Sequence, residues 1–275
     1  MAKDSGQTGA VDHLLVEKEN GVLTLTFNRP EAYNALTKEM QARLGEELTN
    51  AEMDNDVGCI VLTGAGKAFC AGGDVKAMAA THAGGGEIDH IQRMERQRIT
   101  QRLTSLRLFE MAKPTIASLP GATAGAGFSM ALACDMRIAA DTAKMTTAFA
   151  KVGLSGDYGG TYLLTQLVGT AKARELYLLA DRIDMGEASK LGLVNWVVPA
   201  DDLRAETRKL AERLAAGPRL AHRAIKDNLN KALNHTFAEC LDNESVNLMG
   251  LRVTEDHKEA ARAFAEKRTP VFKGR

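Results

Sequence analysis

The sequence predicts an α/β protein whose last quarter is helical. Short apolar runs with strand character alternate with helical patterns up to about residue 200. No strand pattern follows LVNWVVP at 193–199, and Gly217-Pro218 interrupts the helical remainder. We therefore expect a disordered tail over 1–10, an α/β core over 11–200 and a helical region over 201–275.

Composition excludes several classes of protein. The 275 residues include 35 Lys+Arg and 35 Asp+Glu, so the net charge is zero and no global field attracts nucleic acid or an anionic membrane. Hydrophobic residues make up 45% and charged residues 25%, as in ordinary globular proteins. A single large core is expected at this length, since cores stop growing near roughly 250–300 residues.

The cysteines and the N-terminus indicate a reduced, cytoplasmic protein. Cys59, Cys70, Cys134 and Cys240 form no CxxC pair and no zinc-type spacing with histidine, so we expect no metal. The stretch MAKDSGQTGAVDH lacks the apolar centre of a signal peptide. No run approaches the ~20 apolar residues that span a bilayer, so we expect no membrane association.

Strands and helices alternate along the first 200 residues. HLLVEK and VLTLTF, joined by ENG, predict a hairpin that ends before Pro30. One expected helix carries the apolar residues Met40, Leu44, Leu48 and Ala51 at helical spacing. Further helices are expected over about 88–111, 125–133, 161–168 and 171–180. The other expected strands are CIVLT at 59–63, TIASL, MRIAA and 193–199.

Several familiar active-site motifs are missing. The chain has no GxxxxGK[ST] and no HExxH, and neither GAGKAF nor GAGFSM completes GxGxxG. GLSGD places Asp157 where the GxSxG nucleophile elbow needs glycine, which excludes a serine hydrolase of that type.

Two turns of small residues remain, FCAGGD at 69–74 and GATAGAG at 121–127. Each follows a buried strand and opens a helix, so backbone N–H groups can point outward with partial positive charge. Two such turns could hold one oxyanion between them. The alternative is that the glycines only pack strand against helix.

These turns stand among other segments in the order typical of one family: NRPEAYNAL, VLTGAGKAFCAGGD, KPTIASLPGATAGAG, ACDMRIAA, GLSGDYGGTYLLTQLVG, AKARELYL, ASKLGLVNWVVP and AFAEKRTPVFKGR. The chain resembles the crotonase, or enoyl-CoA hydratase/isomerase, superfamily over nearly its whole length. The resemblance implies a crotonase-like spiral of ββα units with a helical C-terminal trimerisation domain. It also implies a homotrimer or a hexamer made of two trimers.

The resemblance further implies a coenzyme A thioester as substrate and no separate cofactor. The backbone N–H groups of Ala71 and Ala126 would form an oxyanion hole that holds the charge of an enolate. The family more often has glycine at the position of Ala126, a change that leaves the backbone donor in place.

The chain departs from the family's hydratases at both catalytic glutamates. Alignment through GATAGAG and GLSGDYGG places Ser129 at the first position and Phe149 at the second. Asp157 lies nearby, where some other branches of the superfamily carry a working aspartate. We therefore expect Asp157 to be the general acid/base. The alternative is a turn or N-cap aspartate for the helix that starts near Gly159.

One carboxylate can move a proton between two carbons, whereas hydration ordinarily needs a second group. The expected activity is therefore enoyl-CoA double-bond isomerisation. One alternative is a 2-enoyl-CoA hydratase in which Tyr158, Tyr162 or Glu110 supplies the second group. Another is an acyl-CoA-binding protein without turnover.

The resemblance places coenzyme A along the segments around Ala32 and from Ala68 to Val75, including Gly72, Gly73 and Asp74. Lys67 and Lys267 are candidates for a phosphate contact, and the alternative for both is a solvated surface lysine. Asp74 is also a candidate N-cap for the helix beginning VKAM, and Asp135 a buried structural partner.

Overall fold

Two β-sheets form the centre of the computed structural model, which describes residues 12–75, 79 and 89–275. The expected tail over 1–10 lies outside these residues. The larger sheet has the strand order β1-β2-β3-β5-β7-β10. Its first two strands, β1 (Leu14–Glu19) and β2 (Val22–Phe27), are the predicted antiparallel hairpin. The turn residues Asn20 and Gly21 have φ values of 51° and 76°, as a tight hairpin turn requires.

The rest of the larger sheet is parallel. Its strands are β3 (Cys59–Gly64), β5 (Thr115–Leu119), β7 (Met136–Ala140) and β10 (Trp196–Val198). The sequence predicted all four. The first three are mostly apolar and buried, as parallel strands are when helices cover both faces of their sheet.

The second sheet is small and was not predicted. Its strands are β4 (Ala68–Cys70), β6 (Ala122–Ala124), β8 (Lys144–Thr146) and β9 (Ile183–Asp184), in that spatial order. Three times along the chain, a strand of the large sheet leads into a strand of the small one. Each pair is followed by helix, which gives the repeated ββα unit that the resemblance implied.

The core helices follow the predicted order, with two differences. They are α1 (Lys38–Met53), α3 (His90–Gln101), α4 (Arg107–Glu110), α5 (Ala126–Ala133), α6 (Gly160–Leu179) and α7 (Met185–Lys190). Short 3-10 turns lie at η1 (Pro30–Ala32), η3 (Phe149–Val152) and η4 (Ala200–Asp202). The helix expected over 88–111 contains a π-helical stretch, η2 (Arg102–Leu106). Helix α7 was not predicted. The break expected between helices 161–168 and 171–180 is confirmed, since Gly169 within α6 has the non-helical angles φ = 76° and ψ = 166°.

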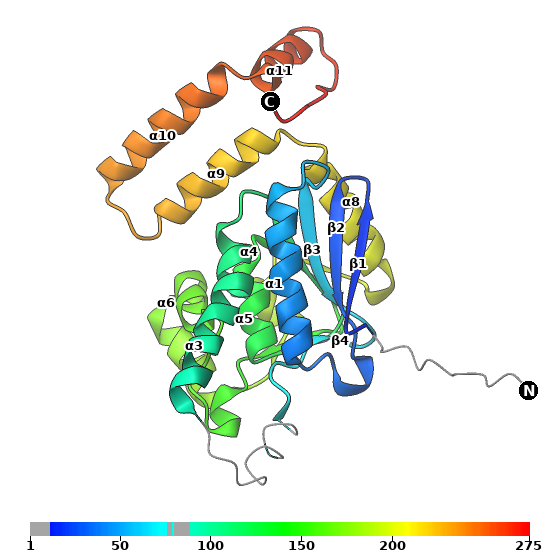
Figure 1. Ribbon diagram of the computed structural model, residues 1–275, viewed down its shortest axis with the longest axis vertical. Coiled ribbons are helices and arrows are strands. Elements are labelled where there is room, and N and C mark those ends of the chain that lie inside the picture. Colours follow the sequence, from blue (N-terminus) through cyan, green and yellow to red (C-terminus); the bar gives the residue numbers. More distant parts are fainter. Residues whose placement is uncertain (1–11, 76–78, 80–88) are drawn as a thin grey trace, which may run out of the picture.

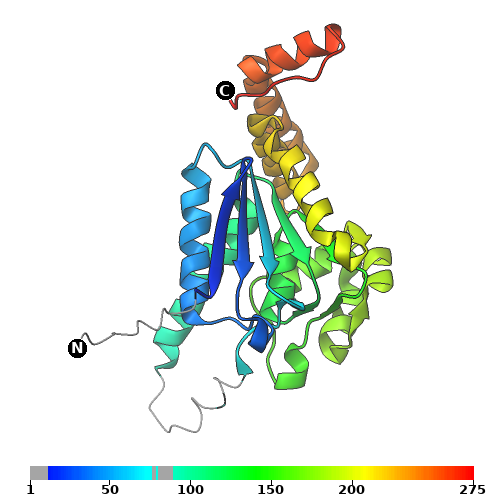
Figure 2. The same ribbon diagram turned by 90° about the vertical axis from the view of Figure 1, so that its right-hand side faces the viewer.

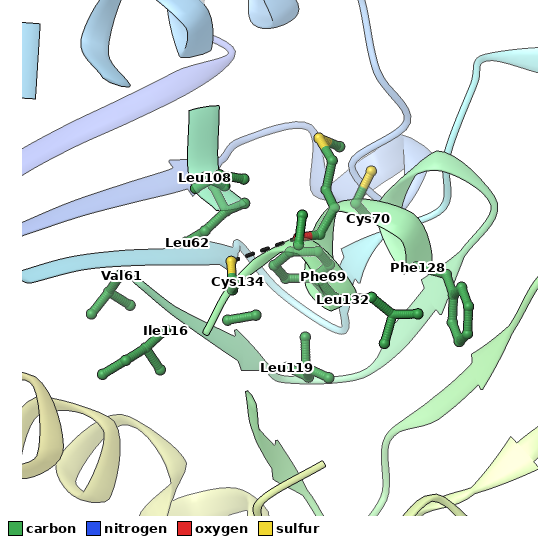
Figure 3. Close-up of a cluster of buried hydrophobic side chains, with 14 of the residues drawn as sticks. Val61, Leu62, Phe69, Cys70, Leu108, Ile116, Leu119, Phe128, Leu132 and Cys134 are labelled. Atoms are coloured by element: carbon green, nitrogen blue, oxygen red, sulfur yellow. Dashed lines mark hydrogen bonds between the residues drawn. The ribbon is translucent and has the colours of Figure 1, made fainter. Parts of the chain in front are cut away.

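A continuous apolar core lies under the two small-residue turns. Figure 3 shows Phe69 and Cys70 of β4 close to Leu62 of β3, with Phe128 on the neighbouring helix α5. All four of these side chains are fully buried. Burial of such side chains stabilises each by roughly 1.5–3 kcal/mol, so the backbone of both turns rests on a rigid base.

The C-terminal helices divide into two groups. They are α8 (Leu203–Ala215), α9 (Arg219–Lys231), α10 (Phe237–Arg252) and α11 (Glu255–Ala265). Helix α8 packs on β3, β5 and β7 and so completes the core. Helices α9, α10 and α11 extend beyond the core at one end (Figures 1 and 2). Among the described residues, no helix is both long and apolar enough to cross a membrane.

Candidate active site

The two small-residue turns are in direct contact. A Cβ at Gly127 would lie 2.3 Å from the Cys70 carbonyl oxygen, so only glycine allows this approach. A Cβ at Gly72 would lie 3.1 Å from the Ala126 nitrogen. The expectation that FCAGGD and GATAGAG lie together is therefore confirmed, and their close packing also serves the fold.

The expected oxyanion donors differ in their present partners. Ala126 begins α5, and no acceptor among the described residues is paired with its N–H group. The Ala71 N–H group, in contrast, donates a hydrogen bond of 2.9 Å to the Tyr33 carbonyl oxygen. The sequence predicts that both N–H groups point outward without a partner, and this is wrong for Ala71. A thioester oxygen at Ala71 would have to replace the Tyr33 carbonyl or share the N–H group with it.

Asp157 lies in the turn between η3 and α6, and its carboxylate does not cap the helix. The N-cap of α6 is Gly159, without a side-chain cap, and only the backbone oxygen of Asp157 accepts from Gly160 N–H, at 3.2 Å. The N-cap alternative is therefore wrong. Asp157 Oδ2 accepts one long hydrogen bond of 3.4 Å from Gln97 Nε2. Asp157 Oδ1 is buried and has no partner among the described residues.

The surroundings of Asp157 favour the neutral form of its carboxyl group. Burial raises the pKa of Asp157 to about 6. Burial also raises the pKa of Cys70 to about 12, and the nearby charge of Asp157 adds to that rise. Cys70 directly precedes Ala71, so the carboxylate is an electrostatic neighbour of the first turn. The pKa of Tyr158 is raised by burial and further by Asp157 and Cys70.

The positions of the two hydratase glutamates are filled by a hydroxyl and an aromatic ring. Ser129 is fully buried on α5, and its Oγ donates a weak hydrogen bond of 3.4 Å to Gly125. The Phe149 ring stacks on Tyr177, with centroids 6.1 Å apart and planes 7° apart. The edge of Phe149 lies 3.9 Å from where a Cβ of Gly125 would be. An aromatic pair therefore stands beside the second turn.

Tyr177 is a member of this site that the sequence analysis missed. Its hydroxyl is buried, and no hydrogen-bond partner for it lies in the part of the chain that the structure describes. A Cβ at Gly160 would lie 2.5 Å from this hydroxyl and 2.2 Å from Ser129 Oγ, so glycine makes room for both. Burial raises the pKa of Tyr177 to about 12; nearby Ser129 partly offsets this rise and Asp157 adds to it. Tyr177 on α6 lies 17 residues beyond the GLSGDYGG segment, within AKARELYL, a segment in which the sequence analysis singled out no residue.

The other two aspartates are already paired. Asp135 accepts from Thr115 N at 2.8 Å, from Thr115 Oγ1 at 3.0 Å and from Lys226 Nζ at 2.8 Å, which confirms its structural role. The expectation that Asp135 is buried is wrong, since its side chain is 27% exposed. Asp74 Oδ2 lies 3.3 Å from Arg29 Nη1. Most of the helix that Asp74 was expected to cap lies outside the described residues.

The segments expected to bind coenzyme A lie side by side. Leu36 N donates to Gly72 O at 2.8 Å, and Leu36 pairs with Gly73, so the strand-like end of NRPEAYNAL runs along FCAGGD. These contacts bring Ala32 in η1 and Ala68 in β4 to one region, where Lys67 and Val75 are exposed. Lys267, also exposed, follows α11 at the opposite end of the chain's fold from β4 (Figure 1). Within one chain, the structure does not bring Lys267 to the other predicted residues.

The three residues that could supply the second catalytic group of a hydratase lie in different surroundings. Tyr158 is buried next to Asp157. Tyr162 is partly exposed, and its hydroxyl donates to Asn234 at 3.2 Å. Glu110 ends α4 and lines pockets beside α9 and α10. Among residues 12–75, 79 and 89–275, no group of three or more His, Cys, Asp or Glu side chains could hold a metal ion.

Comparison with known proteins agrees with this architecture. Residues 17–275 match the sequence profile of the enoyl-CoA hydratase/isomerase family. The chain is 37% identical over 266 residues to 1,2-epoxyphenylacetyl-CoA isomerase of Escherichia coli, covering 96% of this chain and 100% of that protein. It is 34% identical over 265 residues to crotonyl-CoA hydratase of Syntrophomonas wolfei, covering 96% and 98%.

Solved structures show the same fold. An enoyl-CoA hydratase from Polaromonas superposes with a TM-score of 0.88 at 33% identity, covering 94% of this chain and 99% of that chain. The ββα repeat, the helical C-terminal region and the two touching turns are thus the features of a known architecture, the crotonase fold. With a profile match over nearly its whole length, this chain belongs to the enoyl-CoA hydratase/isomerase family.

Proposed function

We propose that the chain is an enoyl-CoA isomerase, which moves the double bond of an acyl-CoA thioester through an enolate. The observation that carries this proposal is the carboxyl group of Asp157, which has one buried oxygen without a partner among the described residues and a pKa raised to about 6 by burial. A base with a pKa near the working pH can both take and return a proton.

The reaction needs only proton transfers. Asp157 takes a proton from the α-carbon of a 3-enoyl thioester, which lies between the carbonyl group and the double bond. The bonding pair moves to give a dienolate with its charge on the thioester oxygen. Protonated Asp157, whose proton can exchange with solvent, then delivers a proton to the γ-carbon, and the electrons return to give the 2-enoyl thioester. No electrons are gained or lost overall, so the proposal includes no cofactor besides the coenzyme A of the substrate.

The enolate oxygen would be held by the N–H groups of Ala126 and Ala71. The Ala126 donor is unpaired among the described residues and begins a helix, which favours negative charge. At Ala71 the enolate oxygen would take over the hydrogen bond now made to Tyr33. Each preorganised donor of this kind contributes ~10²–10³ in rate.

Hydration of a 2-enoyl thioester is a second candidate activity. The buried hydroxyls of Tyr177 and Ser129 meet at the notch left by Gly160, and together they could hold an attacking water. A relative at 34% identity is named crotonyl-CoA hydratase. The third possibility, an acyl-CoA-binding protein without turnover, would leave the raised pKa of Asp157 without a use.

We also propose where coenzyme A binds and how copies of the chain assemble. Coenzyme A would lie along η1 and the β4 turn, where Lys67 is exposed. The exposed apolar side chains of α10 and α11, among them Phe237, Val246 and Phe264, would pack against other copies of the chain in a trimer or in a hexamer of two trimers. A trimer would also allow Lys267 to reach the coenzyme A of a neighbouring copy.

The test is to incubate the enzyme with 2-enoyl and 3-enoyl thioesters in D₂O and to follow three signals: deuterium at the α- and γ-carbons, bond migration and hydration. The proposal expects exchange and migration that Asp157→Asn abolishes. Rapid hydration by Asp157→Asn would contradict the role of Asp157. Coenzyme A binding without any exchange would support the non-catalytic alternative.

A further inference from the structure

Three polar side chains on helix α3 and its continuation η2 hold the turn that carries Asp157. Gln97 Nε2 donates to Asp157 Oδ2 at 3.4 Å. Tyr158 N donates to Gln101 Oε1 at 2.8 Å. Ser105 Oγ donates to Tyr158 O at 2.6 Å. The side chain of Asp157 and both polar backbone groups of the next residue are thus fixed from one element.

The spacing of these residues depends on the π-helical stretch. In an α-helix, four residues overshoot one turn by about 40°, so positions 97, 101 and 105 would drift around the axis. The step from Gln101 to Ser105 runs through η2, where each turn takes more than four residues and the same step falls short. The two deviations oppose each other and bring Ser105 back to the side of Gln97.

The turn needs this support because its backbone is strained. Tyr158 has φ = 52°, in the left-handed region that bulky residues rarely adopt. Its N–H and C=O groups are buried with the rest of the residue, which is 2% exposed, and each finds its partner on α3 or η2. Without these partners the turn would relax and Asp157 would move with it.

We propose that Gln97, Gln101 and Ser105 form a positioning ladder for the proton-transferring aspartate, in which Gln97 holds Oδ2 and leaves Oδ1 for the substrate. The inference rests on the proposed function, since it assigns the ladder to Asp157 as base. Gln97 touches no reacting atom in this scheme and is a positioning residue.

No charged side chain competes with Gln97 for this role among the described residues. The titratable groups whose pKa values respond to Asp157 are Cys70, Tyr158 and Tyr177, and burial raises the pKa of all three. All are neutral near pH 7. The Gln97 amide is therefore the hydrogen-bond donor to the ionised carboxylate among the described residues, and its removal favours protonation.

The experiment compares Gln97→Met with Gln92→Met by α-proton exchange of a 3-enoyl thioester between pH 5 and pH 9. Gln92 lies on the same helix, is exposed, and its side-chain oxygen accepts a hydrogen bond from Arg96. We expect Gln97→Met to lower kcat at pH 7 roughly 10-fold with little change in KM, since a misplaced base mainly slows the chemical step. The acid limb of its pH–rate profile should shift to higher pH by about one unit. Gln92→Met should match the wild type.

A second variant separates positioning from folding. Gln97→Glu keeps the shape of the side chain but adds a like charge, so its acid limb should move further up than that of Gln97→Met. Equal thermal melts of both variants and the wild type would show that the fold is intact.

Failure of the inference and failure of the proposed function give different results. If Asp157→Asn abolishes exchange while both Gln97 variants keep the wild-type limb and kcat, the ladder does not position the base. If Asp157→Asn itself keeps exchange, the proposed function is wrong.

Discussion

Asp135 and Asp157 show how two acidic residues of one fold are set to different tasks. Asp135, between α5 and β7, has three donors within 3.0 Å, one of them the ammonium group of Lys226 on α9. Asp157, between η3 and α6, has one donor at 3.4 Å and one oxygen without a partner. The first carboxylate joins three elements; the second is held in the interior largely unpaired.

The sequence indicated different roles for the two residues, and their partners in the structure give the physical reason. A paired carboxylate lowers the energy of the ionised form and ties it to the fold. A buried carboxylate without a cation is less stable when ionised, and so its proton can be exchanged near neutral pH. Pairing therefore identifies the structural acid, and its absence identifies the candidate for chemistry.

The largest expected effect follows from removing the unpaired acid. Asp157→Asn should lower α-proton exchange by about 10³-fold, since general acid–base groups contribute typically 10²–10⁴. The variant should melt no lower than the wild type at pH 7, because a buried charge has been removed. Exchange by NMR and thermal unfolding by circular dichroism measure the two quantities. A large loss of stability would place Asp157 with Asp135 as a structural acid.

The reverse pattern is expected at Asp135. Asp135→Asn leaves the Lys226 ammonium, which is 7% exposed, without its counter-charge and should lower the free energy of unfolding by about 3 kcal/mol. Activity per folded molecule should be retained. Chemical denaturation compares this variant with Asp56→Asn, whose 3.7 Å pair with Lys18 is solvent-exposed and should contribute less than about 1 kcal/mol. Similar small losses in both variants would remove the distinction.

Much of the fold could be read from the sequence, for reasons visible in its strands. VLTLTF alternates clearly and CIVLT is uniformly apolar, so β2 and β3 were predicted. The strands of the second sheet have only two or three residues, too few to show a period. The π-helical η2 depends on tertiary contacts that local propensity does not encode, whereas the break at Gly169 in α6 falls between the two helices that the sequence predicted.

The site was only partly predictable. Motif order placed Asp157 and both turns, because these segments are local. The Tyr33 carbonyl at Ala71 N–H, and Tyr177 beside Ser129, come from segments far apart in sequence. Gln97, Gln101 and Ser105 recur every four residues, but they lie in a helix otherwise rich in arginine, where such polar spacing is common on a solvated face.

A smaller effect is expected from pH alone. With a pKa of about 6, half of Asp157 is ionised near pH 6, so exchange should fall roughly tenfold for each pH unit well below that value. Because its folded pKa lies above the unfolded value, protonated Asp157 contributes stability that is fully present below the unfolded pKa and is lost as pH rises through about 6. An acid limb near pH 4 would instead indicate a solvated base. Asp157→Asn should remove the stability difference between pH 4 and pH 7 that this residue causes.

The smallest effects are expected at Lys67 and Lys267, because both lysines are exposed and solvent screens their charges. They sharpen the comparison of the two aspartates by showing how little a solvated charge contributes. Lys67→Ala should raise KM for a coenzyme A thioester a few-fold at low salt and leave kcat unchanged, since a solvated ion pair contributes about 0–1 kcal/mol. Lys267→Ala should do the same only if a neighbouring copy brings it to the ligand, so its effect should vanish under conditions where light scattering shows a monomer. Exposed Lys190 on α7 provides the control. A salt-independent loss of kcat at Lys67 would mean that this side chain acts inside the site, and a Lys267 effect in the monomer would mean that the C-terminal helices move toward β4.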